Sequence, residues 1–365
     1  MLILFLISCN HQSEQLSEDE NTEDSLFVAE PDYIEFDSLR KLNISHYFDS
    51  LYQQGFNGVV LIREGNQLFK KAYGLADFKT NDTLTTDYSF QLASSSKPLT
   101  AIAVMLLVQE GKISLEDTIQ TFFPRFPYKG ITVKMLLAHR SGLGNYMYFT
   151  EPSWKNSSTK MTNNDVLKFI EDSIPGTYYQ PNQSFDYNNT NYALLASIVE
   201  KVSQLSFSDF METRIFQPCG MECTKIYEFD NWDKLVKPVK AFNGYKKEKP
   251  FTYIDGVVGD KGVFSTLDDL CKLDIALREN KLLNQSTKAE MYTRYSESKA
   301  YDRSYGLGWR ISDLHENVVY HTGWWKCYRS YFIRDLKNDR TIIVLNNVMI
   351  GGYLNTNLLL RLVEK

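Results

Sequence analysis

Serine-lysine pairs three residues apart are the first candidates for chemistry in this chain. The pattern Ser-x-x-Lys occurs four times, at Ser38/Lys41, Ser94/Lys97, Ser157/Lys160 and Ser296/Lys299. A serine hydroxyl is a poor nucleophile unless a base lies beside it, and residues i and i+3 share one face of a helix. Such a pair therefore predicts a nucleophile with its base. Four occurrences in one chain show that the spacing alone cannot identify the pair.

The surroundings favour Ser94. Residues 94–110 have a strong apolar helical pattern that ends at Gly111, whereas the other three pairs lie in polar stretches. A serine at the start of a helix lies beside unpaired N–H groups that carry partial positive charge. Pro98 fits the first turn, where its missing N–H has little cost. The alternative is that Ser94, Ser95 and Ser96 only cap this helix.

Three further residues are candidates for proton transfer or hydrogen bonding. Tyr187 and Asn189 lie in the segment FDYNNTNY, and His321 lies in HTG. Each also has a structural alternative. Tyr187 is one of 23 tyrosines that could pack a loop, Asn189 could cap a helix, and His321 could bind backbone.

Composition excludes several classes of partner. The net charge is −5 and no Lys/Arg-rich run occurs, so nucleic acid is not expected as a partner. The histidines are scattered and the cysteines lack zinc-ligand spacing, so we expect no metal and no cofactor. Cys219 and Cys223 could form a local disulfide or remain two buried thiols. No feature predicts an oligomeric state.

The N-terminus predicts export. Residues 1–7 are apolar but too few to span a bilayer, which takes about 20 residues. Leu6 to Cys9 read Leu-Ile-Ser-Cys, which resembles a bacterial lipobox, and an acidic stretch follows at 17–24. We therefore expect a signal peptide at 1–9, lipidation of Cys9 and a flexible tether at 10–35 in the bacterial cell envelope. The alternative is a buried N-terminal strand that happens to contain a cysteine.

The elements that must position these residues form an α+β pattern. Strand patterns occur near both chain ends, with a hairpin predicted at 56–74. One strand is predicted in each of four later segments, which are YGLGWRISD, NVVYHTG, YRSYFIRD and RTIIVLNN. The simplest packing is one antiparallel sheet formed by both chain ends, flanked by terminal helices, with an inserted mainly helical domain. A cleft between the two parts is the expected site. The expected boundaries within the domain 36–365 are 36–93 with 255–365 for the α/β part and 94–254 for the insert. Helices are predicted at 36–53, 94–110, 162–172, 191–203, 206–215, 266–279 and 354–364.

Six segments carry a family resemblance. They are FQLASSSKPLTAIAVMLLVQEGKISLEDTI, LLAHRSGL, FDYNNTNYALLASIVEKVS, GDKGVFST, YGLGW and HTG. Their order and separation resemble those of the serine β-lactamase/DD-peptidase superfamily, in the branch of the class C β-lactamases and DD-peptidases. The resemblance extends from about residue 56 to residue 347.

The resemblance implies roles for four residues of the first two motifs. Ser94 would attack a carbonyl and form an acyl-enzyme, with Lys97 beside it. Tyr187 would act as general base and as acid toward the leaving group, and Asn189 would bind the substrate amide and Lys97. The sequence leaves open whether Lys97 or Tyr187 takes the first proton.

The third motif implies an oxyanion hole and a substrate edge. His321 would face Ser94, and the oxyanion would be bound by the backbone N–H groups of Ser94 and Trp324. Many relatives have small residues after this motif, so two tryptophans should narrow the acyl pocket. The further residues expected to bind substrate, including cations for a carboxylate, are Thr322, Gly323, Trp325, Lys326 and Arg329.

These features together predict an exported serine hydrolase. A D-alanyl-D-alanine carboxypeptidase-like peptidase acting on a peptide or small-molecule substrate is the leading interpretation, because His321 replaces the lysine usual in β-lactamases of this branch. An esterase or a β-lactamase is the alternative. A catalytically silent penicillin-binding or sensor module is a more distant one.

Overall fold

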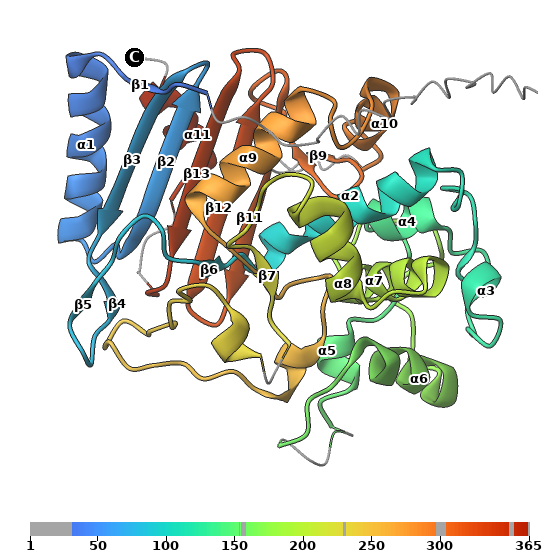
Figure 1. Ribbon diagram of the computed structural model, residues 1–365. Helices are drawn as coiled ribbons and strands as arrows, with labels where there is room; N and C mark the ends of the chain where they lie inside the picture. The colour runs from blue at the N-terminus through green and yellow to red at the C-terminus, as the bar shows by residue number, and fades with distance from the viewer. Residues whose placement is uncertain are drawn as a thin grey trace, which may run out of the picture.

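The fold is α+β, as predicted (Figure 1). The computed structural model describes residues 31–152, 154, 158–228, 231–296, 304–349 and 354–363. The predicted signal peptide, most of the tether and the predicted lipidation site Cys9 lie outside the described residues.

An eight-stranded sheet is built from both ends of the chain, which confirms the prediction. Its pairs are antiparallel except for the two-residue strand at one edge, which pairs in parallel. In spatial order the strands are β1 (Ile34–Glu35), β3 (Gln67–Tyr73), β2 (Gly58–Glu64), β13 (Arg340–Asn346), β12 (Tyr328–Asp335), β11 (Val318–Trp325), β10 (Arg310–Ile311) and β9 (Ser304–Tyr305). The C-terminal strand β13 thus joins the N-terminal hairpin to the rest of the sheet.

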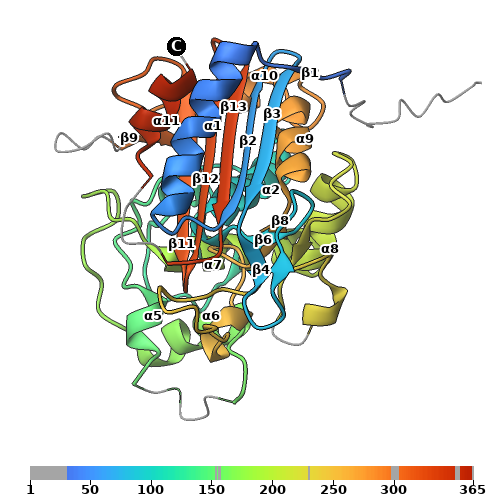
Figure 2. The same ribbon diagram turned by 90° about the vertical axis from the view of Figure 1, so that its left-hand side faces the viewer.

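The terminal helices α1 (Ser38–Gln53) and α11 (Thr356–Val363) cover one face of the sheet (Figures 1 and 2). They bury an apolar cluster that includes Phe48, Ile333 and Leu359. The opposite face is covered by α9 (Leu267–Arg278) and by the helical part of the chain. Both faces are therefore buried, which explains the unbroken apolar runs at 59–62 of β2 and 342–345 of β13.

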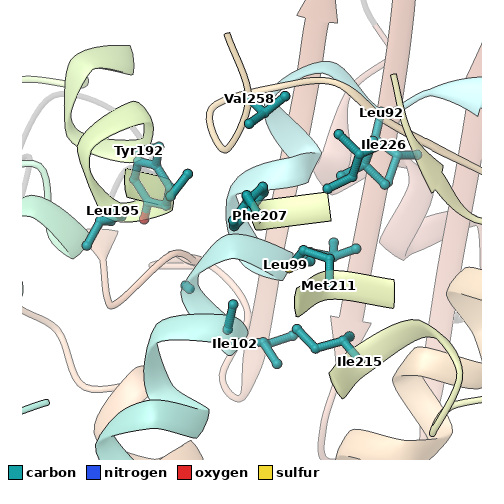
Figure 3. Packing of buried hydrophobic residues seen from close by; sticks show 14 of the residues in the cluster. Leu92, Leu99, Ile102, Tyr192, Leu195, Phe207, Met211, Ile215, Ile226 and Val258 are labelled. Atoms are coloured by element: carbon teal, nitrogen blue, oxygen red, sulfur yellow. The ribbon is translucent and has the colours of Figure 1, made fainter. Parts of the chain in front are cut away.

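The helical part contains short helices around the nearly fully buried α2 (Ser96–Gln109), which packs against α7 (Asn189–Ser203). Figure 3 shows Leu99 and Ile102 of α2 among residues from α7, α8 and β7. The other helices are α3 (Ile119–Phe122), α4 (Val133–Leu137), α5 (Tyr146–Phe149), α6 (Asn163–Ser173), α8 (Phe207–Met211) and α10 (Gln285–Met291). Small sheets pair β4 (Leu75–Asp77) with β5 (Asp82–Thr83), and β6 (Phe90–Gln91), β8 (Val263–Ser265) and β7 (Lys225–Ile226) in that order.

Two local predictions differ from the structure. The helix predicted from Ser94 begins at Ser96, because residues 93–95 form a 3₁₀ turn. The segment YGLGWRISD is not one strand but two, with a turn at 306–309 between β9 and β10. Gly308 in that turn has φ +85°, and a Cβ there would lie 2.3 Å from the Ala101 side chain. The turn is therefore shaped by its close approach to α2.

A buried ion cluster fastens α9 to the sheet. Asp274 on α9 is fully buried and pairs with Arg278 at 2.8 Å, with Arg63 of β2 at 3.1 Å and with Arg334 of β12. Burial alone would raise the pKa of Asp274, but Arg334, Arg278 and Arg63 hold the pKa below its ordinary value. The cluster joins strands from both chain ends through one carboxylate.

Among the described residues, no helix is long and apolar enough to cross a membrane. The described cysteines Cys219, Cys223, Cys271 and Cys327 are all free thiols.

Candidate active site

Ser94 lies in a strained turn at the start of α2. The preceding residue, Ala93, has φ +50°, which is unusual for a side chain with a Cβ. Residues three apart in a helical turn share a face, so Lys97 in the first turn of α2 lies beside Ser94. Ser95 instead lies against Ser330, with 2.8 Å between the hydroxyl oxygens, and the Ser96 hydroxyl accepts a bond from Val263 N–H. Of the three serines, only Ser94 lines the pocket.

Lys97 is fully buried and surrounded by oxygen atoms. Its Nζ lies 3.1 Å from Ser94 Oγ, 2.8 Å from Asn189 Oδ1 and 2.9 Å from the backbone oxygen of Asp260. An ammonium group has three N–H donors, so these contacts match its capacity. Once it has lost a proton, the same amine can accept the Ser94 proton across the 3.1 Å contact.

Tyr187 lies on the loop before α7, with its ring 4.9 Å from Lys97 Nζ. Its hydroxyl is buried and makes no hydrogen bond with the described residues. His139 holds this loop: its ring lies 4.4 Å from the Tyr187 ring, its Nδ1 accepts from Asn188 N–H at 3.0 Å, and its backbone oxygen accepts from Asp186 N–H at 2.9 Å. Burial holds the pKa of His139 well below its usual value, so Nδ1 is free to accept.

His321 is fully buried beside the same group of rings. Its Nδ1 lies 2.9 Å from Thr322 O and its Nε2 lies 3.0 Å from Tyr305 OH. Burial, with Arg310 and Lys97 nearby, lowers the pKa of His321 well below its usual value, so the ring is neutral. A carbonyl can only accept, so Nδ1 carries the proton and Nε2 accepts from Tyr305.

The edge of β11 forms the wall opposite Tyr187. Strand β10 pairs with β11 only at Val319 and Tyr320, so from His321 onward none of the described strands pairs with this edge. The Ser94 turn packs on Gly323: a Cβ there would lie 2.1 Å from Leu92 O and 3.0 Å from Ala93 Cβ. Gly323 therefore permits the close approach that brings Ser94 and Trp324 to one pocket.

The pocket has a volume of about 580 Å³. Of the residues predicted to act on substrate or on Ser94, five are not among those that line it: Lys97, Asn189, His321, Trp325 and Lys326. The Trp325 Nε1 donates to Asp255, and Lys326 Nζ lies 3.7 Å from Asp255 and 3.0 Å from Thr252 Oγ1. The residues lining the pocket are Ser94, Phe185, Tyr187, Arg310, Tyr320, Thr322, Gly323, Trp324, Arg329, Tyr331, Leu354 and Thr356.

Sequence reasoning missed several residues around the site. The guanidinium carbon of Arg310 lies 5.1 Å from the Tyr187 ring centroid, and Tyr305 binds His321. Tyr305 is the first residue of the YGLGW segment, and Arg310 directly follows this segment. Their position at this family motif could have indicated that both lie near the site. Asp260 was also missed, because it acts on Lys97 through its backbone oxygen rather than its side chain.

A second buried lysine lies behind Lys97. Lys261 Nζ donates to Tyr146 OH at 2.7 Å and to Val257 O at 3.1 Å, and lies 3.4 Å from Asp260 Oδ1. Burial lowers the pKa of Lys261. This network holds the turn at 257–261 in place. Because the Asp260 carbonyl in this turn accepts a hydrogen bond from Lys97, the network positions Lys97 indirectly.

Comparison with known proteins places this geometry in a family. A family model described as Beta-lactamase matches residues 42–362. Penicillin-binding protein 4* of Bacillus subtilis is 31% identical over 330 residues, which cover 84% of this chain and 72% of that protein. A putative penicillin-binding protein of the same organism, PbpX, is 31% identical over 281 residues, covering 75% and 66%.

Solved structures share the fold. A penicillin binding protein from Bacillus halodurans superposes with a TM-score of 0.74 at 24% identity, covering 84% of this chain and 95% of that one. The D-amino acid amidase from Ochrobactrum anthropi SV3 also gives 0.74, at 23% identity, covering 90% and 98%. With the match of the family model over most of its length, the chain belongs to the Beta-lactamase family of serine hydrolases.

Proposed function

We propose that this protein is an exported serine hydrolase that acylates Ser94 and cleaves a peptide amide beside a terminal carboxylate. The observation that carries the proposal is the contact of Lys97 Nζ with both Ser94 Oγ and Asn189 Oδ1 beneath a pocket that also contains Tyr187. A nucleophile, its base and an amide-binding side chain are thus within reach of one substrate.

The residues suggest the following steps. Ser94 Oγ attacks the carbonyl carbon while Lys97 or Tyr187 takes its proton, and the oxyanion forms against the N–H groups of Ser94 and Trp324. The tetrahedral intermediate collapses, the C–N bond breaks, and Tyr187 returns the proton to the leaving nitrogen. Water then attacks the acyl-ester, giving a carboxylic acid and free Ser94.

Arg310 favours a carboxypeptidase-like reaction over ester hydrolysis. Its guanidinium lies over the Tyr187 ring, on the side where the leaving group departs, and none of the described carboxylates forms an ion pair with it. A planar guanidinium binds a carboxylate through two parallel hydrogen bonds. The names of the relatives, penicillin-binding proteins, and of the D-amino acid amidase also favour amide substrates.

Trp324 argues against rapid β-lactam turnover. Its indole is 55% exposed beside the proposed oxyanion hole, where it narrows the approach for a bulky acyl group. A β-lactamase or an esterase is the second candidate, and a silent penicillin-binding or sensor module the third. The Lys97 contacts with Ser94 and Asn189 favour an active enzyme over the silent module.

Active-site labelling tests the nucleophile. Wild type should take up a fluorophosphonate and a labelled penicillin, Ser94→Ala should take up neither, and Ser95→Ala should retain both, because Ser95 is turned toward Ser330. Absence of label on wild type, or label that survives in Ser94→Ala, contradicts the proposal. A panel of D-Ala-terminated peptides, p-nitrophenyl esters and a chromogenic lactam then distinguishes the subclasses.

The proposed location in the envelope rests on the N-terminal sequence alone. Processing at Leu6 to Cys9 would leave a lipidated Cys9, a tether and the domain that begins near residue 36. Mass analysis of the mature protein from its native host tests this. An unprocessed Met1, or an unmodified Cys9, contradicts lipid anchoring.

A further inference from the structure

Lys97 is a fully buried lysine that has no carboxylate partner among the described residues. Its Nζ contacts a hydroxyl, a side-chain amide and a backbone oxygen, and none of these groups carries a full charge. Burial of an ammonium group disfavours its charged form unless an opposite charge compensates it. The charges around Lys97 therefore decide whether the amine can lose its proton and accept the one on Ser94.

Titratable and charged side chains surround Lys97 on several elements. They are Tyr187, Tyr192, His139, His321, Arg310, Asp260 and Lys261. Burial lowers the pKa of both histidines well below the ordinary value, so neither histidine adds a charge. Asp260 is the only carboxylate in this set, so it is the group that could stabilise Lys97 as an ammonium ion.

Asp260 presents different groups to the two buried lysines. Its backbone oxygen accepts from Lys97 Nζ at 2.9 Å. Its buried carboxylate instead lies 3.4 Å from Lys261 Nζ and accepts from Tyr146 OH at 3.0 Å. Lys261 is thus the counter-ion of a carboxylate that belongs to a residue in contact with Lys97.

The neighbouring carboxylate, Asp255, also has a lysine of its own. Its Oδ2 lies 3.7 Å from Lys326 Nζ, and Trp325 Nε1 donates to its Oδ1. The two carboxylates are thus paired with two other lysines, and neither remains for Lys97. If a buried carboxylate lost its counter-ion, its charge would act on the next cation, because charges interact strongly in a low-dielectric interior.

The two buried lysines also act on each other. Burial lowers the pKa of Lys261, Asp260 and Asp255 raise it, and the charge of Lys97 lowers it further. Because the Coulomb interaction is mutual, the charge of Lys261 equally disfavours the ammonium form of Lys97. Lys261 therefore acts twice in the same direction, since it neutralises Asp260 and repels a proton on Lys97.

We propose that Lys261 is a positioning residue that acts through Lys97: it neutralises the Asp260 carboxylate, so that Lys97 can exist as a free amine and take the proton of Ser94. The inference rests on the proposed function and deepens it, because it assigns the first proton transfer to Lys97 and leaves Tyr187 to protonate the leaving group. A lysine that only fastened the fold would change activity equally at every pH. A lysine that sets the charge of Lys97 changes the pH at which acylation begins.

The pH dependence of Ser94 labelling by a fluorophosphonate tests this role. The Oγ–P bond forms, the P–F bond breaks and the base takes the Ser94 proton; fluoride leaves without an acid, so the rate reports the base alone. In Lys261→Met the acid limb, the pH range over which the rate rises, should move up by about one pH unit or more. The rate at a fixed pH on that limb then falls roughly tenfold, and at high pH it should approach the wild-type rate.

Three further variants make the test specific to charge. Asp260→Asn alone should move the acid limb to lower pH, and the double variant of Lys261→Met with Asp260→Asn should return it toward wild type, because the pair leaves together. Lys288→Met is the matched control and should not move the limb. Lys288 is also a buried lysine, 6% exposed, but its Nζ donates to Leu277 O and it does not line the pocket of Ser94.

Two outcomes overturn the inference. One is an equal loss of rate at every pH in Lys261→Met. The other is an acid limb in the double variant that is displaced as far as in Lys261→Met. Thermal unfolding of each variant shows that the compared proteins are folded, and if Lys261→Met does not fold, an unmoved limb in Asp260→Asn refutes the role.

An NMR titration distinguishes failure of this inference from failure of the proposed function. In protein made with lysine isotopically labelled at Cε, the Lys97 resonance is the one that is absent from Lys97→Met. It should titrate at higher pH in Lys261→Met than in wild type. If it does so and yet wild type takes up no fluorophosphonate, the coupling of the two lysines stands and the proposed attack by Ser94 is wrong. If it titrates at the same pH in both proteins, the inference is refuted whatever the labelling shows.

Discussion

At the scale of single residues, the clearest functional signal in the site is the Tyr187 hydroxyl, which has no hydrogen-bond partner among the described residues. A buried hydroxyl without a hydrogen bond usually costs about 1–3 kcal/mol, so a fold has no reason to retain one for stability. The Tyr187 ring lies 4.9 Å from Lys97 Nζ and lines the same pocket as Ser94, so a reacting group there could supply the missing partner. This combination points to proton transfer rather than packing.

Tyr187→Phe should therefore separate activity from stability. We expect the rate of acylation by a labelled penicillin to fall roughly 10²- to 10⁴-fold, because a general acid-base group is lost. The free energy of unfolding should stay the same or rise by up to about 1 kcal/mol, because the buried polar atom is removed without loss of a hydrogen bond. Stopped-flow labelling and urea unfolding measure the two quantities. A large loss of stability would show that the hydroxyl has a structural partner.

The local chemistry could be read from the sequence, whereas the shape of the pocket could not. Ser94 and Lys97 are three residues apart, so almost any helical turn brings them together. The proximity of Arg310 to Tyr187 depends on the turn at 306–309, where Gly308 packs on α2. Trp325 and Lys326 are adjacent to the lining residue Trp324, yet both turn to Asp255. Whether a side chain at the end of the β11–β12 hairpin faces the pocket depends on its tertiary contacts, which the spacing of residues in the sequence does not reveal.

At the scale of elements, the site depends on the contact between the Ser94 turn and strand β11. Gly323 lies at this contact, and its missing side chain lets Leu92 O and Ser330 Oγ approach to within 2.1 Å and 2.4 Å of where a Cβ would be. Neither neighbour can move easily, because one is backbone and the other is held by Leu92 O and Ser95. Gly323 thus sets the width of the proposed oxyanion hole.

Gly323→Ala should force the turn and the strand apart. We expect a loss of about 1–3 kcal/mol in the free energy of unfolding, typical of overpacking, together with slower acylation of Ser94. Gly176→Ala is the matched control, because nothing lies within 4 Å of its added Cβ. Urea unfolding and penicillin labelling of the two variants give the comparison. If the two variants had the same free energy of unfolding and the same labelling rate, the Ser94 turn and β11 would be able to move apart without loss of stability or activity.

At the scale of the whole molecule, burial of the histidines makes stability depend on pH. His139 and His321 are neutral in the folded protein, whereas an ordinary histidine in the unfolded chain takes up a proton near pH 6.5. Below that pH the unfolded chain binds more protons than the folded protein. The stabilisation is therefore fully present above about pH 6.5 and is lost as the pH falls further.

The free energy of unfolding should consequently fall between pH 6.5 and pH 5, by up to about 1.4 kcal/mol per pH unit for each histidine. Asp269 acts in the opposite direction, since burial raises its pKa to about 6. The test therefore compares how steeply the free energy of unfolding falls as the pH is lowered. Urea unfolding at several pH values should give a smaller fall per pH unit for His139→Asn than for wild type. Identical slopes would contradict a neutral, buried His139.

The overall architecture was largely predictable, because alternating and helical patterns fix elements and their order. The sheet from both chain ends and the terminal helices follow from such patterns in residues 56–74 and 305–347. The ion cluster around Asp274 was not predictable, since its partners Arg63 and Arg334 are far from it in the chain. Long-range pairing of charges depends on the register of strands, which no local pattern specifies.

The position of β13 has a consequence for how the protein reaches this fold. The strand lies between β2 and β12, so the N-terminal hairpin cannot gain this neighbour until residues 340–346 have been synthesised, more than 260 residues after the hairpin. Such non-local pairing carries a large loop-closure entropy and slows folding. An early chain also exposes the apolar edge of β2, a template for aggregation. The sheet can close only after residues 340–346 have been synthesised, and a truncation before residue 340 would remove the strand that joins its two halves.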